Sequence, residues 1–184
     1  YKNLVMITLG TGIGGGVIIG ERIVSGLFGA AGEFGHMPIV QDEPDFCNCG
    51  RKGCLEQAAS ATGIVKEAKR RLEKKTEPSL LENRKDLTAK DVFDAAHEGD
   101  SLALGVIDRA ARYLGIAMAC VTGVVDPDVF LIGGGVAAVG KTLLEPLERY
   151  YRENVLFLSK DTPIRLATLK NDAGIYGAAR MVLE

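Results

Sequence analysis

The segment LVMITLGTGIGGGVII, residues 4–19, decides the fold because two apolar stretches flank five glycines. Residues 4–9 and 17–19 are rich in β-branched side chains, and the glycine-rich turn at residues 10–16 predicts a hairpin between them. The glycines contain the spacing G-x-G-x-x-G, but a dinucleotide-binding fingerprint continues into a helix, whereas a strand follows here. The segment therefore excludes a Rossmann fold.

The glycine turn is also a first candidate for phosphate binding. A turn with five glycines can point bare backbone N–H groups toward phosphate oxygens, and the Thr11 hydroxyl adds another donor. The alternative interpretation is a flexible turn that binds no ligand.

The rest of the chain predicts an α/β protein. Apolar residues at spacings of three and four, together with a capping box at Thr88 and Asp91, indicate helices. The predicted helices cover residues 55–74, 88–96, 104–125, 142–152 and a last segment from 173 onward. Further strands are predicted at residues 129–132 and 164–169, so strand and helix alternate and imply a parallel sheet. Cys120 lies among apolar residues of the longest helix and is predicted to pack in the core.

The strongest candidate site is the segment CNCGRKGC, residues 47–54, which holds three cysteines. Its two glycines allow the chain to curl so that the three sulfur atoms converge. Zinc prefers four such ligands in a tetrahedron, and a histidine eleven residues upstream supplies the fourth. The predicted ligands are His36, Cys47, Cys49 and Cys54. Because they fill the coordination sphere, the zinc is predicted to be structural; reduced surface thiols or an adventitious disulfide are the alternatives.

Two carboxylates flank this predicted zinc site. Glu33 lies three residues before His36, and Glu56 lies two residues after Cys54. A carboxylate accepts hydrogen bonds from neighbouring sugar hydroxyls, and a zinc-bound imidazole keeps its second ring nitrogen free. The arrangement predicts a sugar site beside the metal. In the alternative interpretation the two glutamates are exposed loop or helix-start charges.

A competing phosphate motif lies at residues 135–142, GVAAVGKT, which matches the Walker A pattern between a predicted strand and a predicted helix. Only 42 residues follow it, the strand at residues 164–169 has no clear acidic end for magnesium, and Pro146 lies in the second turn of the helix. We therefore favour a different role, in which the glycines at residues 133–135 allow close approach of a nucleotide's adenosine end.

Composition excludes several classes of partner. The chain has 184 residues, a net charge of −2 and no long basic run, which disfavours nucleic acid. The first apolar stretch is too short to span a membrane and lacks the flanks of a signal peptide. We expect a cytoplasmic protein that binds small molecules, and the start at Tyr1 within a strand-like segment suggests a fragment.

Taken together, the motifs resemble the ROK family of sugar kinases and sugar-responsive repressors, and within it most of all the bacterial glucokinases. The resemblance covers essentially the whole chain. It rests on LGTGIGGGV at residues 9–17, ExGH at 33–36 followed by CxCGxxGCxE at 47–56, DPDVFLIGGGV at 126–136 and DAGIYGAA at 172–179.

The resemblance implies an actin-like, ribonuclease H-like ATPase fold, of which this chain is the larger, carboxy-terminal lobe. It implies zinc on the four predicted ligands and an ATP-dependent hexose kinase that uses Mg²⁺, with glucose as the expected hexose and a homo-oligomeric assembly. The implied sugar contacts are Glu33, His36 and Glu56. The implied second phosphate loop is Gly10, Thr11, Gly12, Ile13, Gly14, Gly15, Gly16 and Val17, and the implied adenosine contacts are Gly133, Gly134 and Gly135.

The chain also departs from the family pattern. The family's first phosphate loop, DxGxT, and the Asn-Asp pair that supplies the catalytic base belong to an amino-terminal domain and are missing from this sequence. Asn171-Asp172 imitates that pair but matches the family's closing motif instead. We therefore expect no catalytic base in this chain and no activity from it alone. The sensory half of a repressor is the alternative within the family, and a P-loop NTPase the alternative outside it.

Overall fold

The computed structural model describes residues 1–41, 43–75, 77–82, 84–136, 140–169 and 172–182. Five strands form one mixed sheet in the order β3-β2-β1-β4-β5. The strands are β1 (Leu4–Leu9), β2 (Ile13–Ile19), β3 (Arg22–Ile23), β4 (Val129–Gly133) and β5 (Ile164–Leu166). The central strand β1 pairs antiparallel with β2 and parallel with β4, which in turn pairs parallel with β5. The predicted hairpin and the predicted parallel pairing of the later strands are thus both confirmed.

The hairpin turn is shorter than predicted. Leu9 pairs with Ile13, so β2 includes the last three glycines and the turn contains only residues 10–12. Gly15 of β2 has a packing role: a Cβ there would lie 2.4 Å from a ring carbon of Phe34 and 2.8 Å from the Gly32 carbonyl oxygen. Because Gly15 has no side chain, residues 32–34 can pack directly on the strand.

Six helices accompany the described part of the sheet. They are α1 (Glu56–Ala59), α2 (Ala61–Lys74), α3 (Ala89–His97), α4 (Ser101–Val125), α5 (Lys141–Asn154) and α6 (Ala173–Val182), with 3-10 turns η1 (Phe34–His36) and η3 (Phe157–Ser159). The single helix predicted over residues 55–74 is wrong, because Ser60 has an extended backbone and its hydroxyl accepts the Gly63 N–H at 3.0 Å. Ser60 therefore begins α2 as a new helix.

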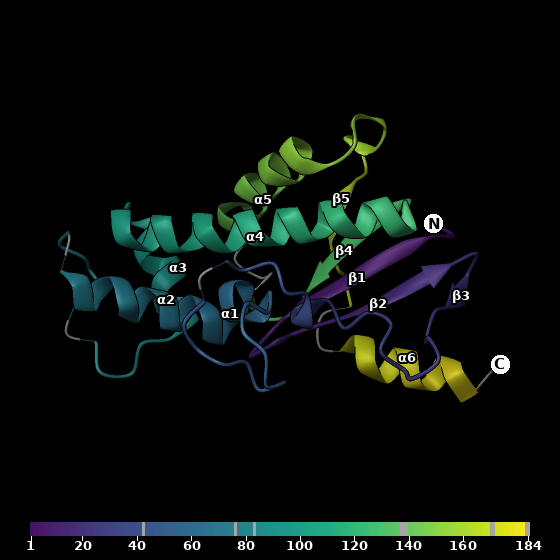
Figure 1. The fold of residues 1–184 in the computed structure, drawn as a ribbon, viewed down its shortest axis with the longest axis horizontal. Coiled ribbons are helices and arrows are strands. Elements are labelled where there is room, and N and C mark those ends of the chain that lie inside the picture. The colour runs from purple at the N-terminus through teal and green to yellow at the C-terminus, as the bar shows by residue number, and fades with distance from the viewer. Residues whose placement is uncertain (42, 76, 83, 137–139, 170–171, 183–184) are drawn as a thin grey trace.

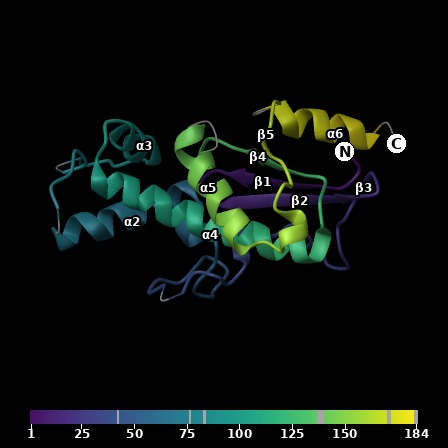
Figure 2. The same ribbon diagram turned by 90° about the horizontal axis from the view of Figure 1, so that it is seen from above.

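The helices lie in layers around the sheet. Helices α4 and α5 cover one face and α6 lies over the other, while α2 and α3 lie beyond one end of the strands (Figures 1 and 2). The strands β1 and β4 both end toward α1, α2 and α3 (Figure 1). In α/β sheets this carboxyl end of the parallel strands is where ligands bind.

The longest helix, α4, supplies much of the core. Leu114, Met118 and Val121 are buried along one face, as predicted. Two predictions for this helix are wrong, because Leu104 is 44% exposed and Cys120 is exposed. Cys120 lies between buried residues in sequence, but the helical rotation turns it away from the face that α5 and the sheet cover. Among the described residues, no helix is both long and apolar enough to cross a membrane.

Candidate functional site

The structure brings together all four predicted metal ligands. One ligand atom each from His36, Cys47, Cys49 and Cys54 lies within 4.8 Å of the others. The Cys49 and Cys54 sulfurs are 3.5 Å apart, and Cys47 Sγ lies 3.7 Å from His36 Nδ1. A tetrahedral zinc site with ordinary Zn–S and Zn–N bonds needs separations of about 3.5–3.8 Å between ligand atoms. The four residues therefore fit zinc, and the cysteines form no disulfide.

Backbone turns bring the ligands together. Gly50 and Gly53 both have positive φ, of 82° and 81°, and the Cys47 N–H donates to the Arg51 carbonyl at 2.7 Å, which closes the curl. A Cβ at Gly53 would lie 2.7 Å from the Val40 carbonyl oxygen, so only glycine fits this approach. The antiparallel bridge between Pro38 and Cys54 then brings the His36 segment against the cysteine segment.

The thiols differ in acidity. Burial raises the pKa of Cys47 to about 12 and also raises the pKa of Cys54. The backbone N–H of Arg51 lowers the pKa of Cys49 to about 6. Because coordination requires thiolates, a metal bound here would release protons chiefly from Cys47 and Cys54 and would bind less tightly as the pH falls.

The two carboxylates lie on either side of the histidine. Nδ1 of His36 faces the thiols and lies 3.8 Å from Glu56 Oε1, whereas Nε2 lies 4.0 Å from Glu33 Oε2. Cys47 Sγ also donates to Glu56 Oε1 at 2.9 Å. If Nδ1 binds the metal, Nε2 and the Glu33 carboxylate remain as adjacent polar groups for a ligand hydroxyl.

The glycine turn rests on the junction between α1 and α2. The Ala61 N–H donates to the Gly10 carbonyl and the Thr62 hydroxyl donates to the Thr11 carbonyl, both at 2.8 Å. At Gly12 a Cβ would lie 2.8 Å from Glu56 Oε2, so the turn approaches the carboxylate closely. The residues predicted to contact phosphate and one residue predicted to contact sugar are therefore neighbours in space.

Two cavities meet at this turn. The smaller, of about 160 Å³, lies beside the metal ligands and is lined by Thr11, Gly12, Cys47, Asn48, Glu56 and Lys66 among others. The larger, of about 650 Å³, lies between the turn and α3 and includes Gly10, Thr11, Phe93, His97, Gly135 and Val136. Thr11 lines both, so a ligand in the large cavity would have its end next to the small one.

The predicted adenosine residues are only partly placed at the large cavity. Gly135 lines it, whereas Gly133 ends β4 and Gly134 packs against β1, where a Cβ would lie 2.3 Å from the Leu9 carbonyl oxygen. Sequence reasoning missed Phe93 and His97 of α3, which no local motif marks. His97 Nε2 lies 2.6 Å from the Thr142 hydroxyl, which joins α3 to the start of α5.

The competing Walker A motif, residues 135–142, lies only partly within the described residues, because residues 137–139 are outside them. Its first glycine, Gly135, lines the large cavity, and Gly140 precedes α5 with a positive φ of 65°. Asn171 of the Asn-Asp imitation also lies outside the described residues. Asp172 immediately precedes α6, a helix that lies on the sheet face opposite α4 and α5 (Figure 2).

The chain is similar to proteins of one family in both sequence and structure. The profile of the ROK family matches residues 1–184. A glucokinase of Halalkalibacterium halodurans is 43% identical over 187 residues, which cover 100% of this chain and 57% of the relative. The chain thus spans little more than half the length of that relative.

Two solved structures are also similar. A ROK family glucokinase from Streptomyces griseus, in complex with glucose and AMPPNP, has a TM-score of 0.85 and 35% identity over 98% of this chain and 60% of its own. A ROK family transcriptional regulator, a homolog of the E. coli MLC protein, has a TM-score of 0.86 and 33% identity over 97% of this chain and 45% of its own.

Proposed function

Because the chain belongs to the ROK family, we propose that it is the carboxy-terminal lobe of an ATP-dependent hexose kinase, with glucose as the first substrate to test. Its likeness to a solved ROK glucokinase confirms the actin-like ATPase fold predicted from the sequence. The observation that carries the proposal is the position of Thr11, which lines both cavities. A nucleotide in the large cavity would present its terminal phosphate beside the carboxylate of Glu56.

Each residue has a defined task in this proposal. Glu33, Glu56 and the free Nε2 of His36 hold the sugar hydroxyls, because carboxylates accept them in pairs. Phe93 and Gly135 contact the adenosine end, while Thr11 and Gly12 of the turn donate their backbone N–H groups to phosphate oxygens, since the Gly10 N–H already donates to the Gly12 carbonyl. Bound zinc would supply structure only, since four protein ligands complete its tetrahedron.

The reaction is a phosphoryl transfer. A sugar hydroxyl oxygen forms a bond to the terminal phosphorus of ATP while the bond to the bridging oxygen breaks and ADP leaves. The hydroxyl proton goes to a base that we assign to an amino-terminal lobe outside this chain. Mg²⁺ that accompanies ATP would neutralise charge on the phosphates. This lobe contributes positioning, on which phosphoryl transfer chiefly depends, and should be nearly inactive by itself.

The sensory half of a transcriptional repressor is the second candidate, because a ROK transcriptional regulator is structurally as similar as the glucokinase. The glycine turn favours the kinase, since Thr11 and its neighbouring glycines have a direct use in holding phosphate. A repressor needs the sugar site but has no need for a phosphate-binding turn.

The deciding experiment is a phosphoryl-acceptor screen of the zinc-loaded full-length protein with MgATP and glucose, fructose, mannose and N-acetylmannosamine, measured as ADP formation. We expect one hexose to be phosphorylated. Sugar binding by calorimetry without ADP formation from any acceptor would refute the kinase and support the repressor. A P-loop NTPase predicts that Lys141→Ala abolishes nucleotide binding, whereas our proposal predicts little change in ATP affinity.

A further inference from the structure

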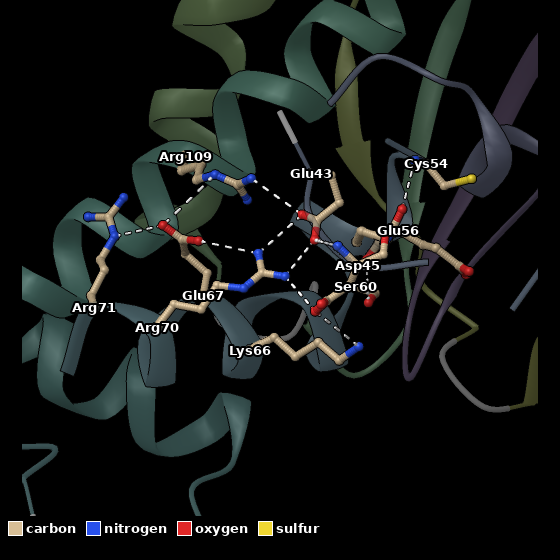
Figure 3. A network of polar contacts seen from close by, with 11 residues as sticks. Glu43, Asp45, Cys54, Glu56, Ser60, Lys66, Glu67, Arg70, Arg71 and Arg109 are labelled. Carbon is tan, nitrogen blue, oxygen red and sulfur yellow. Dashed lines mark hydrogen bonds and ion pairs between the residues drawn. The ribbon is translucent and has the colours of Figure 1, made fainter. Parts of the chain in front are cut away.

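A buried cluster of charges anchors the loop that leads into the metal site. The side chain of Glu43 is only 1% exposed, and Arg70 of α2 binds both of its carboxylate oxygens, one of them at 3.2 Å. Arg109 of α4 lies 3.8 Å from the same carboxylate. Figure 3 shows the Arg70 guanidinium between Glu43 and Asp45 on one side and Glu67 on the other. Two helices therefore hold one acidic side chain of the loop.

Arg70 holds a second point of the same loop. One of its terminal nitrogens lies 2.6 Å from Asp45 Oδ2, so a single guanidinium binds two acids that are two residues apart (Figure 3). The planar guanidinium suits such a double contact, because its donors point outward in a fixed fork. The metal ligand Cys47 follows Asp45 by two residues.

A hydrogen-bonded link continues from this loop to the other side of the metal site. The Gln57 side-chain amide donates to the Asp45 carbonyl at 2.9 Å, and its oxygen accepts the Cys54 N–H at 3.0 Å. Gln57 directly follows Glu56, the proposed sugar-binding carboxylate. The loop that Arg70 holds is thus linked to the cysteine segment at both ends, directly at Cys47 and through Gln57 at Cys54.

The loop has few other restraints. Within the described part of the chain, residues 43–46 make no backbone-to-backbone hydrogen bond and belong to no helix or strand. Side chains must therefore fix the path of these residues. A buried carboxylate that lost its guanidinium partner would be strongly unfavourable, so the loop would move to let Glu43 reach water.

We propose that Arg70, acting through Glu43 and Asp45, is a positioning residue that holds Cys47 and Cys49 in reach of His36 and Cys54. Its effect on the sugar carboxylate Glu56 rests on the function proposed above. Its effect on metal retention does not, because that depends only on the geometry of the four ligands. The two consequences can be measured separately.

The test is the rate at which the zinc-loaded full-length protein releases zinc to a chromophoric chelator. We expect Arg70→Met and Glu43→Gln each to accelerate release by about tenfold to a hundredfold, the usual cost of losing support around metal ligands. Because both variants remove the contact between Arg70 and Glu43, their effects on zinc release should combine less than additively in the double variant. Arg70→Lys should restore only part of the retention, since an ammonium cannot bind both acids in the same way.

Arg71→Met is the matched control. Arg71 neighbours Arg70 on α2 but pairs at 2.9 Å with Glu67 of its own helix and not with the loop. Its variant should release zinc within about twofold of the wild-type rate, because its ion pair stays within α2 and does not hold the loop. Hydrogen exchange of the peptide spanning residues 43–57 gives a readout without metal, and exchange should be faster in Arg70→Met than in Arg71→Met.

The outcomes separate the proposals. Zinc release by Arg70→Met at the rate of Arg71→Met, or additive effects in the double variant, would overturn the positioning role. If Arg70→Met does not fold, Glu43→Gln, which removes the charge but keeps the shape, decides the same question. If the variants show the expected differences in zinc release but the wild-type protein phosphorylates no hexose, the proposed kinase would be overturned and the positioning role would stand.

Discussion

Replacing Gly12 with alanine separates stability from sugar binding. An added Cβ would lie 2.8 Å from Glu56 Oε2, where ordinary contact begins at 3.4 Å, so the oxygen must move by about 0.6 Å. Gly12 is not among the glycines with positive φ, and alanine therefore fits its backbone. The atom that must move ends a flexible side chain, so we expect the free energy of unfolding to stay within about 1 kcal/mol of wild type.

The substitution should instead lower the affinity of the protein for the sugar. A Glu56 carboxylate displaced from its hydroxyl partner loses a hydrogen bond to a charged group, worth about 1.5–3 kcal/mol. That corresponds to an increase of about 10–150-fold in the dissociation constant for the sugar. The affinity for ATP should change less, because the backbone N–H groups of the turn remain.

The assay is calorimetric titration of the full-length protein with glucose, or with the hexose found in the acceptor screen, beside thermal unfolding. Gly123→Ala is the matched control, since it makes the same chemical change on the exposed face of α4 with no atom within 4 Å of the added carbon. It should leave sugar binding unchanged. Wild-type sugar affinity in Gly12→Ala would refute the assignment of Glu56 to the sugar.

Two further predictions concern metal and stability. Cys54→Ser should lose zinc, measured by elemental analysis after chelator-free purification, because a serine hydroxyl is a poor replacement for a thiolate; Cys120→Ser, at an exposed thiol outside the ligand set, should retain it. Asp100 begins α4 and accepts N–H groups from Ala103 at 2.8 Å and Leu80 at 2.6 Å. Burial alone would raise the pKa of Asp100, but these N–H groups lower it below its usual value. Its stabilisation is therefore present above about pH 4, the unfolded pKa, and lost as the pH falls through the folded pKa. Asp100→Ala should lower the free energy of unfolding by about 1–2 kcal/mol at pH 7 in urea titrations, and the difference should shrink in acid; an equal difference at both pH values would contradict the assignment.

The convergence of the four predicted metal ligands was the best-predicted part of the candidate site. Thiols and imidazole have few other uses in such a short segment, and the glycines that curl it are part of the same motif. The chemistry and the geometry are therefore encoded locally, and the predicted residues His36, Cys47, Cys49 and Cys54 converge as expected.

Features that depend on distant packing were predicted less well. Gly15 lies within β2 with residues 32–34 packed against it, a contact that the hairpin segment itself does not indicate. Phe93 lines the large cavity only because α3 lies beside the turn at Gly10 and Thr11, far away in the sequence. The pairing of Glu43 with Arg70 spans 27 residues and has no local signal. The break at Ser60, in contrast, had a readable signal, since serine is a preferred helix-capping residue.

The four-residue helix α1 acts as a spacer of fixed length. Glu56 at its start faces the metal loop, while Ala61 and Thr62, just past its end, carry the glycine turn through their contacts with Gly10 and Thr11. One added or deleted residue there would rotate these two attachments relative to each other by about 100° on the helix. An insertion or deletion in this short stretch would therefore pull the contact with the glycine turn out of register with the contact to His36.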